Sequence, residues 1–202
     1  MFFKPGEHAP HLKSDPFKAL VAPRPIGWIS TRATDGRINL APYSYFNALC
    51  DDPWLVAFAS DGPKDSATFA AESGEFVCNI VTWEFAESMV STSVDAPRGT
   101  SEFDYAGLEM EPSAFVKSPR VKGIKAALEC KVTEITRPKL LSGQASPVHL
   151  VIGEVVGIFV DESIVHNGKV TASSITQVSR LGGLNYGIVG EIFAHERPKW
   201  QT

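Results

Sequence analysis

The 202-residue chain has few cysteines, no excess of positive charge and no long apolar run. Its three cysteines, Cys50, Cys78 and Cys130, are far apart and form no CxxC pair, so neither a disulfide framework nor a cysteine-rich zinc site is expected. The net charge of −4 gives no general attraction to nucleic acid or to an anionic membrane. No apolar stretch approaches the roughly 18 residues that span a bilayer, and no signal-peptide pattern opens the chain. We therefore expect a cytoplasmic protein that binds neither nucleic acid nor membranes.

Several sequence motifs that carry well-known chemistry are also absent. No GxGxxG follows the first expected strand, which removes support for a Rossmann dinucleotide site. There is no P-loop, no HExxH and no G-x-S-x-G elbow, although Ser/His/Asp catalysis without that elbow stays open. His8, His11, His166 and His195 share no metal-ligand spacing, so no metal is predicted.

What the chain does contain is typical of one globular domain. Hydrophobic residues make up 44% and charged residues 21% of the sequence. Residues 1–20 are rich in proline and histidine and are expected to be a lead-in. Residues 21–202 are expected to form a single domain, because at this length folding buries enough surface for a core without metal or disulfide.

Hydrophobic periodicity predicts roughly seven strands and two short helices. Six of these strands are expected at 26–31, 38–41, 54–60, 76–81, 126–137 and 148–165. Asp35 and Gly36 predict a type I′ hairpin turn, and the last strand should bend at Gly153 or Gly157. Short turns favour antiparallel pairing and a closed barrel with helices outside, while a βαβ unit over 54–81 stays open.

The predicted helices are placed by their end signals. Asp65 or Ser66 is expected to cap a helix that ends at Gly74 in the left-handed conformation. A second helix over 82–90 has Thr82 as its expected N-cap. Residues 94–125 are expected to be mainly loop.

The turn at 60–69, SDGPKDSATF, has the properties of a phosphate site. A helix N-terminus offers free backbone N–H groups and the positive end of its dipole. Lys64 adds a positive charge, and Ser60, Ser66 and Thr68 add hydroxyls. A solvated capping turn explains the same residues and stays open as the alternative.

Three other groups are candidates for ligand contact. Arg24 lies between two prolines that stiffen its backbone, so its guanidinium suits a phosphate, unless it is an ordinary surface arginine in a rigid loop. The segment 180–186, RLGGLNY, places Arg180 and Tyr186 around two glycines, either against a flat ring or phosphate or as a plain turn. His149 opens the last long strand and is a candidate catalytic group or a surface or capping histidine.

The segment 41–47, APYSYFN, fits neither a simple strand nor a solvent loop. It is too apolar for solvent, and its hydrophobic period is broken. Backbone groups left free there must find partners. A planar heterocycle with donors and acceptors on its edge would provide them, and a core-crossing loop with ordered water is the alternative.

Six stretches together resemble the flavin reductase-like, FMN-binding split-barrel family, which includes flavoredoxin-type proteins. They are RPIGWIST, NLAPYSYFNALCDDPWLVAFAS, KDS, GEFVCNIV, HLVIGEVVGIFVD and SRLGGLNY, and they run from about Arg24 to Tyr186. The resemblance implies a mainly β fold, a six-stranded antiparallel Greek-key split barrel with short flanking helices. It also implies a homodimer with one FMN per subunit, at or near the dimer interface.

The resemblance implies roles for individual residues. Those that would line the flavin ring are Ser44, Tyr45, Phe46 and Asn47. Those that would shape the phosphate end are Ser60, Lys64, Asp65 and Ser66, where Ser66 replaces the threonine more usual in the family. Five residues of the first-strand and C-terminal motifs would also lie near the cofactor: Arg24, Ser30, Thr31, Arg180 and Tyr186. His149 matches a histidine that in some reductases of this type lies near the nicotinamide.

These features predict an FMN-dependent oxidoreductase of the flavin reductase type. NADH or NADPH would supply hydride to the flavin, and electrons would then pass onward, so no side chain has to act as nucleophile or base. Two alternatives stay open. One is an FMN-bound electron carrier reduced by a redox partner protein, and the other is a non-catalytic FMN-binding protein.

Overall fold

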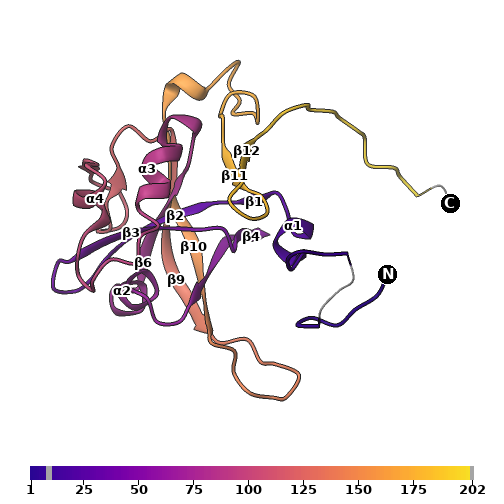
Figure 1. Ribbon diagram of the computed structural model, residues 1–202. Coiled ribbons are helices and arrows are strands. Elements are labelled where there is room, and N and C mark those ends of the chain that lie inside the picture. Colours follow the sequence, from indigo (N-terminus) through magenta and orange to yellow (C-terminus); the bar gives the residue numbers. More distant parts are fainter. Residues whose placement is uncertain (8–10, 201–202) are drawn as a thin grey trace.

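The computed structural model describes residues 1–7 and 11–200, so His8 lies outside the described residues. The protein is mainly β, and one large antiparallel sheet curls into a split barrel with short helices outside it (Figure 1). The strand order of this sheet is β3-β2-β6-β9-β10-β5-β4. The strands are β2 Gly27–Arg32, β3 Ile38–Tyr43, β4 Phe46–Asp51, β5 Trp54–Asp61, β6 Glu75–Ile80, β9 Ala126–Thr136 and β10 Val148–Val160.

Every neighbouring pair in the large sheet is antiparallel. The predicted antiparallel barrel is therefore confirmed, with seven strands in this sheet rather than six. No βαβ unit forms over residues 54–81, because β5 pairs with β4 and β10 while β6 pairs with β2 and β9.

The two edges of the large sheet follow each other directly in the chain. β3 and β4 are the edge strands, and only Ser44 and Tyr45 separate them. The ring of Tyr43 on β3 lies 4.8 Å from the ring of Phe58 on β5, centroid to centroid. The N–H of Ala59 donates to the Tyr45 carbonyl at 2.8 Å. The sheet thus curls until its edges meet, which defines the split.

The prediction that the segment 41–47 is irregular is wrong for most of its length. Residues up to Tyr43 belong to β3, and Phe46 begins β4. The hydrophobic period breaks because a two-residue connection lies between two strands that occupy opposite edges of the sheet.

The hairpin between β2 and β3 also differs from its prediction. The N–H of Gly36 donates to the Ala33 carbonyl at 3.0 Å, and the N–H of Ala33 donates to the Arg37 carbonyl at 2.9 Å. Gly36 has a φ of +94°, whereas Asp35 has no positive φ. This is a three-residue loop with a left-handed glycine at its end, not a type I′ turn. The Asp35 carboxylate instead pairs with Arg37 at 2.8 Å.

The helices are short, with bounds α1 Phe17–Leu20, α2 Asp65–Ser73, α3 Ala86–Ser91 and α4 Glu102–Tyr105, and with 3₁₀ turns η1 Trp83–Phe85 and η2 Glu162–Ile164. Gly74 ends α2 with a φ of +71°, as predicted. The predicted N-cap of α2 is wrong, because Lys64, one residue before Asp65, occupies that position. Thr82 is the N-cap residue of η1, as predicted, although its side chain makes no capping hydrogen bond.

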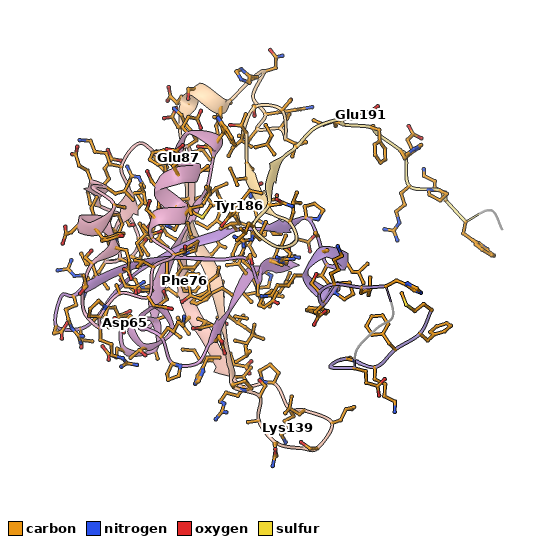
Figure 2. All side chains as sticks on the ribbon, viewed as in Figure 1. Asp65, Phe76, Glu87, Lys139, Tyr186 and Glu191 are labelled. Atoms are coloured by element: carbon orange, nitrogen blue, oxygen red, sulfur yellow. The ribbon has the colours of Figure 1, made fainter. Side chains whose placement is uncertain are left out.

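Two small sheets complete the structure. β1 Arg24–Pro25, β11 Val178–Arg180 and β12 Tyr186–Ile188 form one, and β7 Met110–Glu111 pairs with β8 Arg120–Val121 in the other. The glycine-rich segment 180–186 is therefore the turn of the β11–β12 hairpin. Beyond β12 the chain leaves the body of the protein as an extended segment that carries Glu191 (Figure 2).

β10 bends where its glycines lie, as predicted. Its register against β9 shifts between Ile152 and Gly153 and again between Val155 and Gly157. A Cβ atom at position 153 would lie 2.5 Å from the ring of Phe76, which is fully buried. A side chain at this position would therefore force the strand or the Phe76 ring to shift.

Candidate functional site

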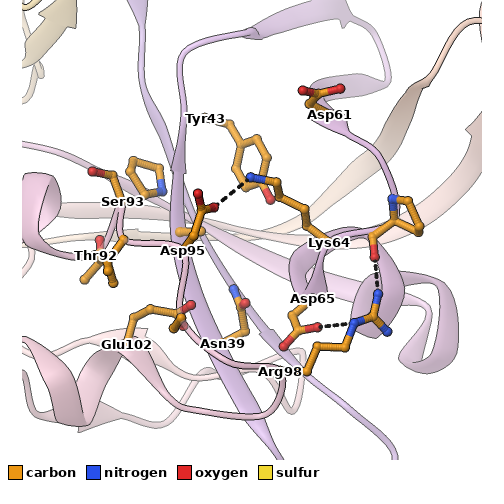
Figure 3. Close-up of a pocket in the computed structure, with 15 residues that line it drawn as sticks. Asn39, Tyr43, Asp61, Lys64, Asp65, Thr92, Ser93, Asp95, Arg98 and Glu102 are labelled. Atoms are coloured by element: carbon orange, nitrogen blue, oxygen red, sulfur yellow. Dashed lines mark hydrogen bonds and ion pairs between the residues drawn. The ribbon is translucent and has the colours of Figure 1, made fainter.

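A hollow of about 340 Å³ opens where the end of β3, the β5–α2 turn and the loop 92–98 meet (Figure 3). Its volume falls within the roughly 300–1,000 Å³ that is usual for small-molecule sites. The polar and charged side chains that line it are Asn39, Tyr43, Asp61, Lys64, Asp65, Thr92, Ser93, Asp95, Arg98 and Glu102.

Lys64 reaches across the hollow from the start of α2. Its backbone is extended, with φ −70° and ψ 167°, so that it directs the chain into the helix. Its Nζ atom lies 3.2 Å from Oδ1 of Asp95 on the facing loop. Both side chains are largely exposed, at 57% and 93%, so this ion pair is open to solvent.

A second cation, Arg98, holds the same loop against α2. Its Nη2 atom donates to the Pro63 carbonyl at 2.7 Å, and its Nε atom lies 3.8 Å from Oδ1 of Asp65. Oδ2 of Asp65 accepts the backbone N–H of Gly99 at 3.0 Å. Asp65 is thus committed to fixing the loop, which explains why it does not cap its own helix.

A layer of hydroxyl and amide groups lies under the start of α2. Ser66 is buried, and its Oγ accepts a hydrogen bond from Nδ2 of Asn39 at 2.9 Å. Ser60 is fully buried and donates to the Gly62 carbonyl at 2.9 Å. Burial raises the pKa of Tyr43, and the hydroxyls of Ser66 and Ser60 oppose that rise. Tyr43 therefore stays a neutral hydroxyl beside them at ordinary pH.

Glu102 brings a buried carboxylate to the hollow. Glu102 is only 7% exposed, and its Oε2 atom accepts a hydrogen bond from the backbone N–H of Leu40 at 2.9 Å. Burial raises the pKa of this carboxyl, and the nearby Asp65 carboxylate raises it further. The hydrogen bond links α4 to β3 across the hollow.

Thr31 carries a buried hydroxyl beside the hollow that is not satisfied. The residue is fully buried, and its Oγ1 has no hydrogen-bond partner in the described part of the chain. It pairs across the sheet with Asn39, which lines the hollow.

The donor set of the hollow fits a phosphorylated ligand. Two cations, Lys64 and Arg98, line it together with the hydroxyls of Tyr43, Thr92 and Ser93 and with four carboxylates, and it lies at the start of the nine-residue helix α2.

The residues predicted to line a ring lie at the split rather than in the hollow. Ser44 is half-buried, Tyr45 is 44% exposed and Asn47 is exposed, while Phe46 is buried. Their neighbour Tyr43 lines the hollow, so the split and the hollow adjoin along the end of β3.

Arg24 is buried next to Tyr45, with its guanidinium carbon 5.7 Å from the centre of the Tyr45 ring. Its Nη1 atom donates to the backbone carbonyls of Lys18 and Val21 at 2.5 and 2.6 Å, and its Nη2 atom donates to that of Leu181 at 3.1 Å, while its buried Nε has no hydrogen-bond partner among the described residues. The arginine thus ties α1 and the β11–β12 turn to the first strand, and it does not line the hollow.

Arg180 and Tyr186 contact each other across the β11–β12 hairpin. The Arg180 guanidinium lies 4.4 Å from the centre of the Tyr186 ring and donates a hydrogen bond to the Tyr186 hydroxyl. It also donates to the Gly183 carbonyl at 2.7 Å. These contacts hold the hairpin turn, away from the hollow.

Ser30 and His149 complete the predicted set. The buried Ser30 hydroxyl donates to the Pro119 carbonyl and accepts from Nδ2 of Asn79 at 3.2 Å, so it belongs to the core network. His149 is half-buried and pairs with Ser60 across β10 and β5. Its buried Nδ1 atom has no hydrogen-bond partner in the described part of the chain.

The structure adds residues that sequence reasoning missed. Arg98, Asp95 and Glu102 come from the region predicted as loop. Arg98 follows Pro97, as Arg24 follows Pro23, but Gly99 comes next instead of a second proline, so the local sequence gave only a weak signal. Asn39 is a buried amide inside an apolar strand, and a polar residue at such a position is itself informative.

Across residues 1–7 and 11–200, no three His, Cys, Asp or Glu side chains gather into a group that could hold a metal ion. The same residues contain no helix that is both long and apolar enough to cross a membrane.

The split barrel and its hollow place the chain in a known class of proteins. The family described as "Flavin reductase like domain" matches residues 20–172, and the chain belongs to this flavin reductase-like family. An uncharacterized protein from Aquifex aeolicus is 36% identical over 173 residues, which cover 83% of this chain and 85% of that protein.

Solved structures of similar proteins agree with this family. Nitrilotriacetate monooxygenase component B from Bacillus cereus has a TM-score of 0.86 at 29% identity, covering 96% of this chain and 98% of that one. The 2-nitrobenzoate 2-nitroreductase NbaA of Pseudomonas fluorescens has a TM-score of 0.78 at 29% identity, covering 92% and 90%. Flavoredoxin of Desulfovibrio vulgaris (Miyazaki F), at 20% identity, TM-score 0.76 and coverage of 94% and 96%, shows the fold alone. Together the family and the two relatives at 29% identity support a flavin-related oxidoreductase role and a flavin cofactor.

Proposed function

We propose that the protein is an FMN-dependent oxidoreductase of the flavin reductase type, with NADH or NADPH as electron donor. The observation that carries the proposal is the hollow at the start of α2, whose cations and hydroxyls suit a phosphate, in a chain of the flavin reductase-like family. When bound, FMN would supply the hydride and electron chemistry that no side chain of the protein provides.

The residues of the hollow would hold the phosphate end of the cofactor. Lys64 and Arg98 would supply positive charge, and the first N–H groups of α2 and the Ser66 hydroxyl would supply hydrogen bonds. The adjoining connection of Ser44 and Tyr45 would lie along the ring, where it would limit access of water.

His149 remains the candidate group on the nicotinamide side. The free Nδ1 atom and the position opposite Ser60 are the observations in its favour. Its role would be to donate or accept a hydrogen bond with the incoming nucleotide, not to act as a nucleophile.

The first test is flavin binding followed by turnover. Purified protein should quench the fluorescence of added FMN to saturation, and the loaded protein should oxidise NADH or NADPH in an absorbance assay at 340 nm. Saturable FMN binding without oxidation of either nucleotide would instead favour the electron carrier that a partner protein reduces. Absence of any FMN binding would refute the flavin function altogether.

Substitution of Lys64 provides a sharper prediction. Lys64→Ala should weaken FMN binding about tenfold and riboflavin binding little, because only FMN carries the phosphate. Lys122→Ala is the matched control, since Lys122 forms a similarly exposed pair with Glu109 outside the hollow. Equal losses for both flavins in Lys64→Ala would place the phosphate elsewhere.

A homodimer is the assembly that we propose. Leu49, Trp54, Val156 and Ile158 expose 54%, 56%, 38% and 46% of their surface on the adjacent strands β4, β5 and β10. Exposed apolar side chains gathered on neighbouring strands favour an interface with a second copy.

Light scattering after size-exclusion chromatography tests the dimer. The wild-type protein should elute at about twice its 21.9 kDa chain mass, and Ile158→Lys should shift the population toward the monomer. Tyr105→Lys, at an exposed aromatic residue on α4, should leave the dimer unchanged. A monomeric wild-type protein at micromolar concentration would contradict the proposal.

The proposed setting is the reducing cytoplasm. Cys50, Cys78 and Cys130 are all free, and burial raises the pKa of the Cys78 and Cys130 thiols. A reducing environment would keep the exposed Cys50 as a thiol.

A further inference from the structure

Lys64, the cation best placed for a ligand phosphate, already has an anionic partner in the protein. Oδ1 of Asp95 lies 3.2 Å from its Nζ atom, across the mouth of the hollow (Figure 3). Within the described residues this is the one hydrogen bond that the Asp95 side chain makes. Its side chain is 93% exposed, so no packing holds it in place.

The second ion pair of the hollow is built differently. Asp65 leaves only 13% of its side chain exposed, and it accepts the Gly99 N–H in addition to facing Arg98. Removal of that carboxylate would leave a backbone N–H and a loop without their anchor. Asp95 anchors no backbone group in this way, so an incoming anion can displace its carboxylate from Lys64.

The excess of negative charge around the hollow means that a phosphate can pair with Lys64 only if the Asp95 carboxylate moves away. Four carboxylates, those of Asp61, Asp65, Asp95 and Glu102, face two cations. A phosphate dianion that approaches Lys64 therefore meets the Asp95 carboxylate first. Like charges a few ångströms apart repel each other even in water-like surroundings.

We propose that Asp95 is an internal competitor for the phosphate subsite, which neutralises Lys64 while the site is empty and lowers its affinity for phosphorylated ligands. The inference rests on the proposed function, because it assumes that the hollow receives a phosphate. In this proposal, Asp95 sets how strongly the site prefers a phosphorylated flavin to an unphosphorylated one.

The test compares Asp95→Asn with the wild type in fluorescence titrations with FMN and with riboflavin. Loss of the carboxylate frees Lys64 and removes the repulsion, so FMN should bind roughly three- to tenfold more tightly, with riboflavin unchanged. The gain should shrink at 1 M salt, because the Debye length there is only about 3 Å. Asp95→Ser provides a second variant should the amide make a new hydrogen bond.

Two controls separate this mechanism from a general charge effect. Asp104→Asn removes the same charge from an exposed residue of α4 that does not line the hollow, and it should leave both affinities unchanged. In a Lys64→Met background, Asp95→Asn should lose most of its effect on FMN, because the two side chains act as one pair.

The outcomes distinguish the inference from the function on which it rests. Weaker FMN binding by Asp95→Asn, or a change equal to that in Asp104→Asn, would overturn the inference while leaving FMN binding intact. If the wild type bound no flavin, the proposed function would fail, and titration with inorganic phosphate, followed by thermal shift, would then decide the inference. A larger stabilisation of Asp95→Asn than of the wild type by phosphate would support it, and equal stabilisation would overturn it.

Discussion

Glu102 is a carboxylate that folding removes almost completely from water. Because burial raises its pKa in the folded protein, protonated Glu102 is favoured by folding and ionised Glu102 is disfavoured. The resulting stability is fully present below the ordinary pKa of 4.5 and is lost as the pH rises through the folded-state pKa. At neutral pH the ionised side chain is therefore a cost to the fold.

Glu102→Gln tests this directly. The glutamine keeps an oxygen that can accept the Leu40 N–H and cannot ionise, so the variant should be more stable than the wild type at pH 7.5. The difference in the free energy of unfolding should shrink as the pH falls toward 4.5. Urea unfolding at several pH values measures it, with the exposed Glu109→Gln as control. A difference that does not vary with pH would contradict the assignment.

Individual site residues were predictable only where the signal is local. Lys64 and Ser66 could be predicted because the signals for the start of a helix lie in consecutive residues. Asp95, Arg98 and Glu102 could not, because a long loop brings them to α2 and β3 only in the folded chain. The sequence also could not reveal that backbone carbonyls accept from both terminal nitrogens of Arg24.

Among the elements, β10 depends on two glycines whose surroundings differ. A Cβ at Gly153 would collide with the buried ring of Phe76, whereas a Cβ at Gly157 would collide with the ring of Phe115, which is 64% exposed. A buried ring is fixed by its neighbours, but an exposed ring can turn away into solvent.

The two alanine substitutions should therefore differ in cost. Gly153→Ala should lower the free energy of unfolding by about 1–3 kcal/mol, and Gly157→Ala by less than about 1 kcal/mol. Chemical denaturation of both variants measures the difference. Equal costs would mean that Phe115 is held as firmly as Phe76.

Strands and helices with a clear period were predictable from the sequence, and their connections were not. The bend of β10 and the end of α2 at Gly74 followed from single glycines. The Asp35-Gly36 turn was assigned the wrong type because the dipeptide fits both a two-residue loop and a three-residue loop, and the pairing of Ala33 with Arg37 decides between them.

At the scale of the whole molecule, the C-terminal segment stands apart from the folded body. Residues 190–200 have no helix or strand, are exposed along their whole length, and carry Phe193 and Trp200 at 79% and 92% exposure. In the described part of the chain they make no hydrogen bond to the barrel.

Truncation after Val189 should change the free energy of unfolding by less than about 0.5 kcal/mol. Truncation before Tyr186 provides the contrast, because it removes β12 and the partner of Arg180 and should destabilise the protein. Thermal unfolding of the two truncated proteins at low concentration checks the prediction. A large loss from the shorter cut would show that the segment packs on the barrel.

The barrel itself was predictable because antiparallel pairing follows from short connections and alternating strands. The order of the strands was not, since β3 and β4 are neighbours in sequence but occupy opposite edges of the sheet. Short turns already favoured a closed barrel, and the resemblance to known split barrels added that the closure is split.

The connection of Ser44 and Tyr45 also limits how far the edge strands β3 and β4 can separate. Three peptide steps of 3.8 Å separate Tyr43 from Phe46, so the two edges cannot part by more than about 11 Å at this end. At their other ends, near Ile38 and Asp51, no comparable tether joins the two strands within the described chain. The chain therefore ties the two edges of the split together at one end only, beside Tyr43.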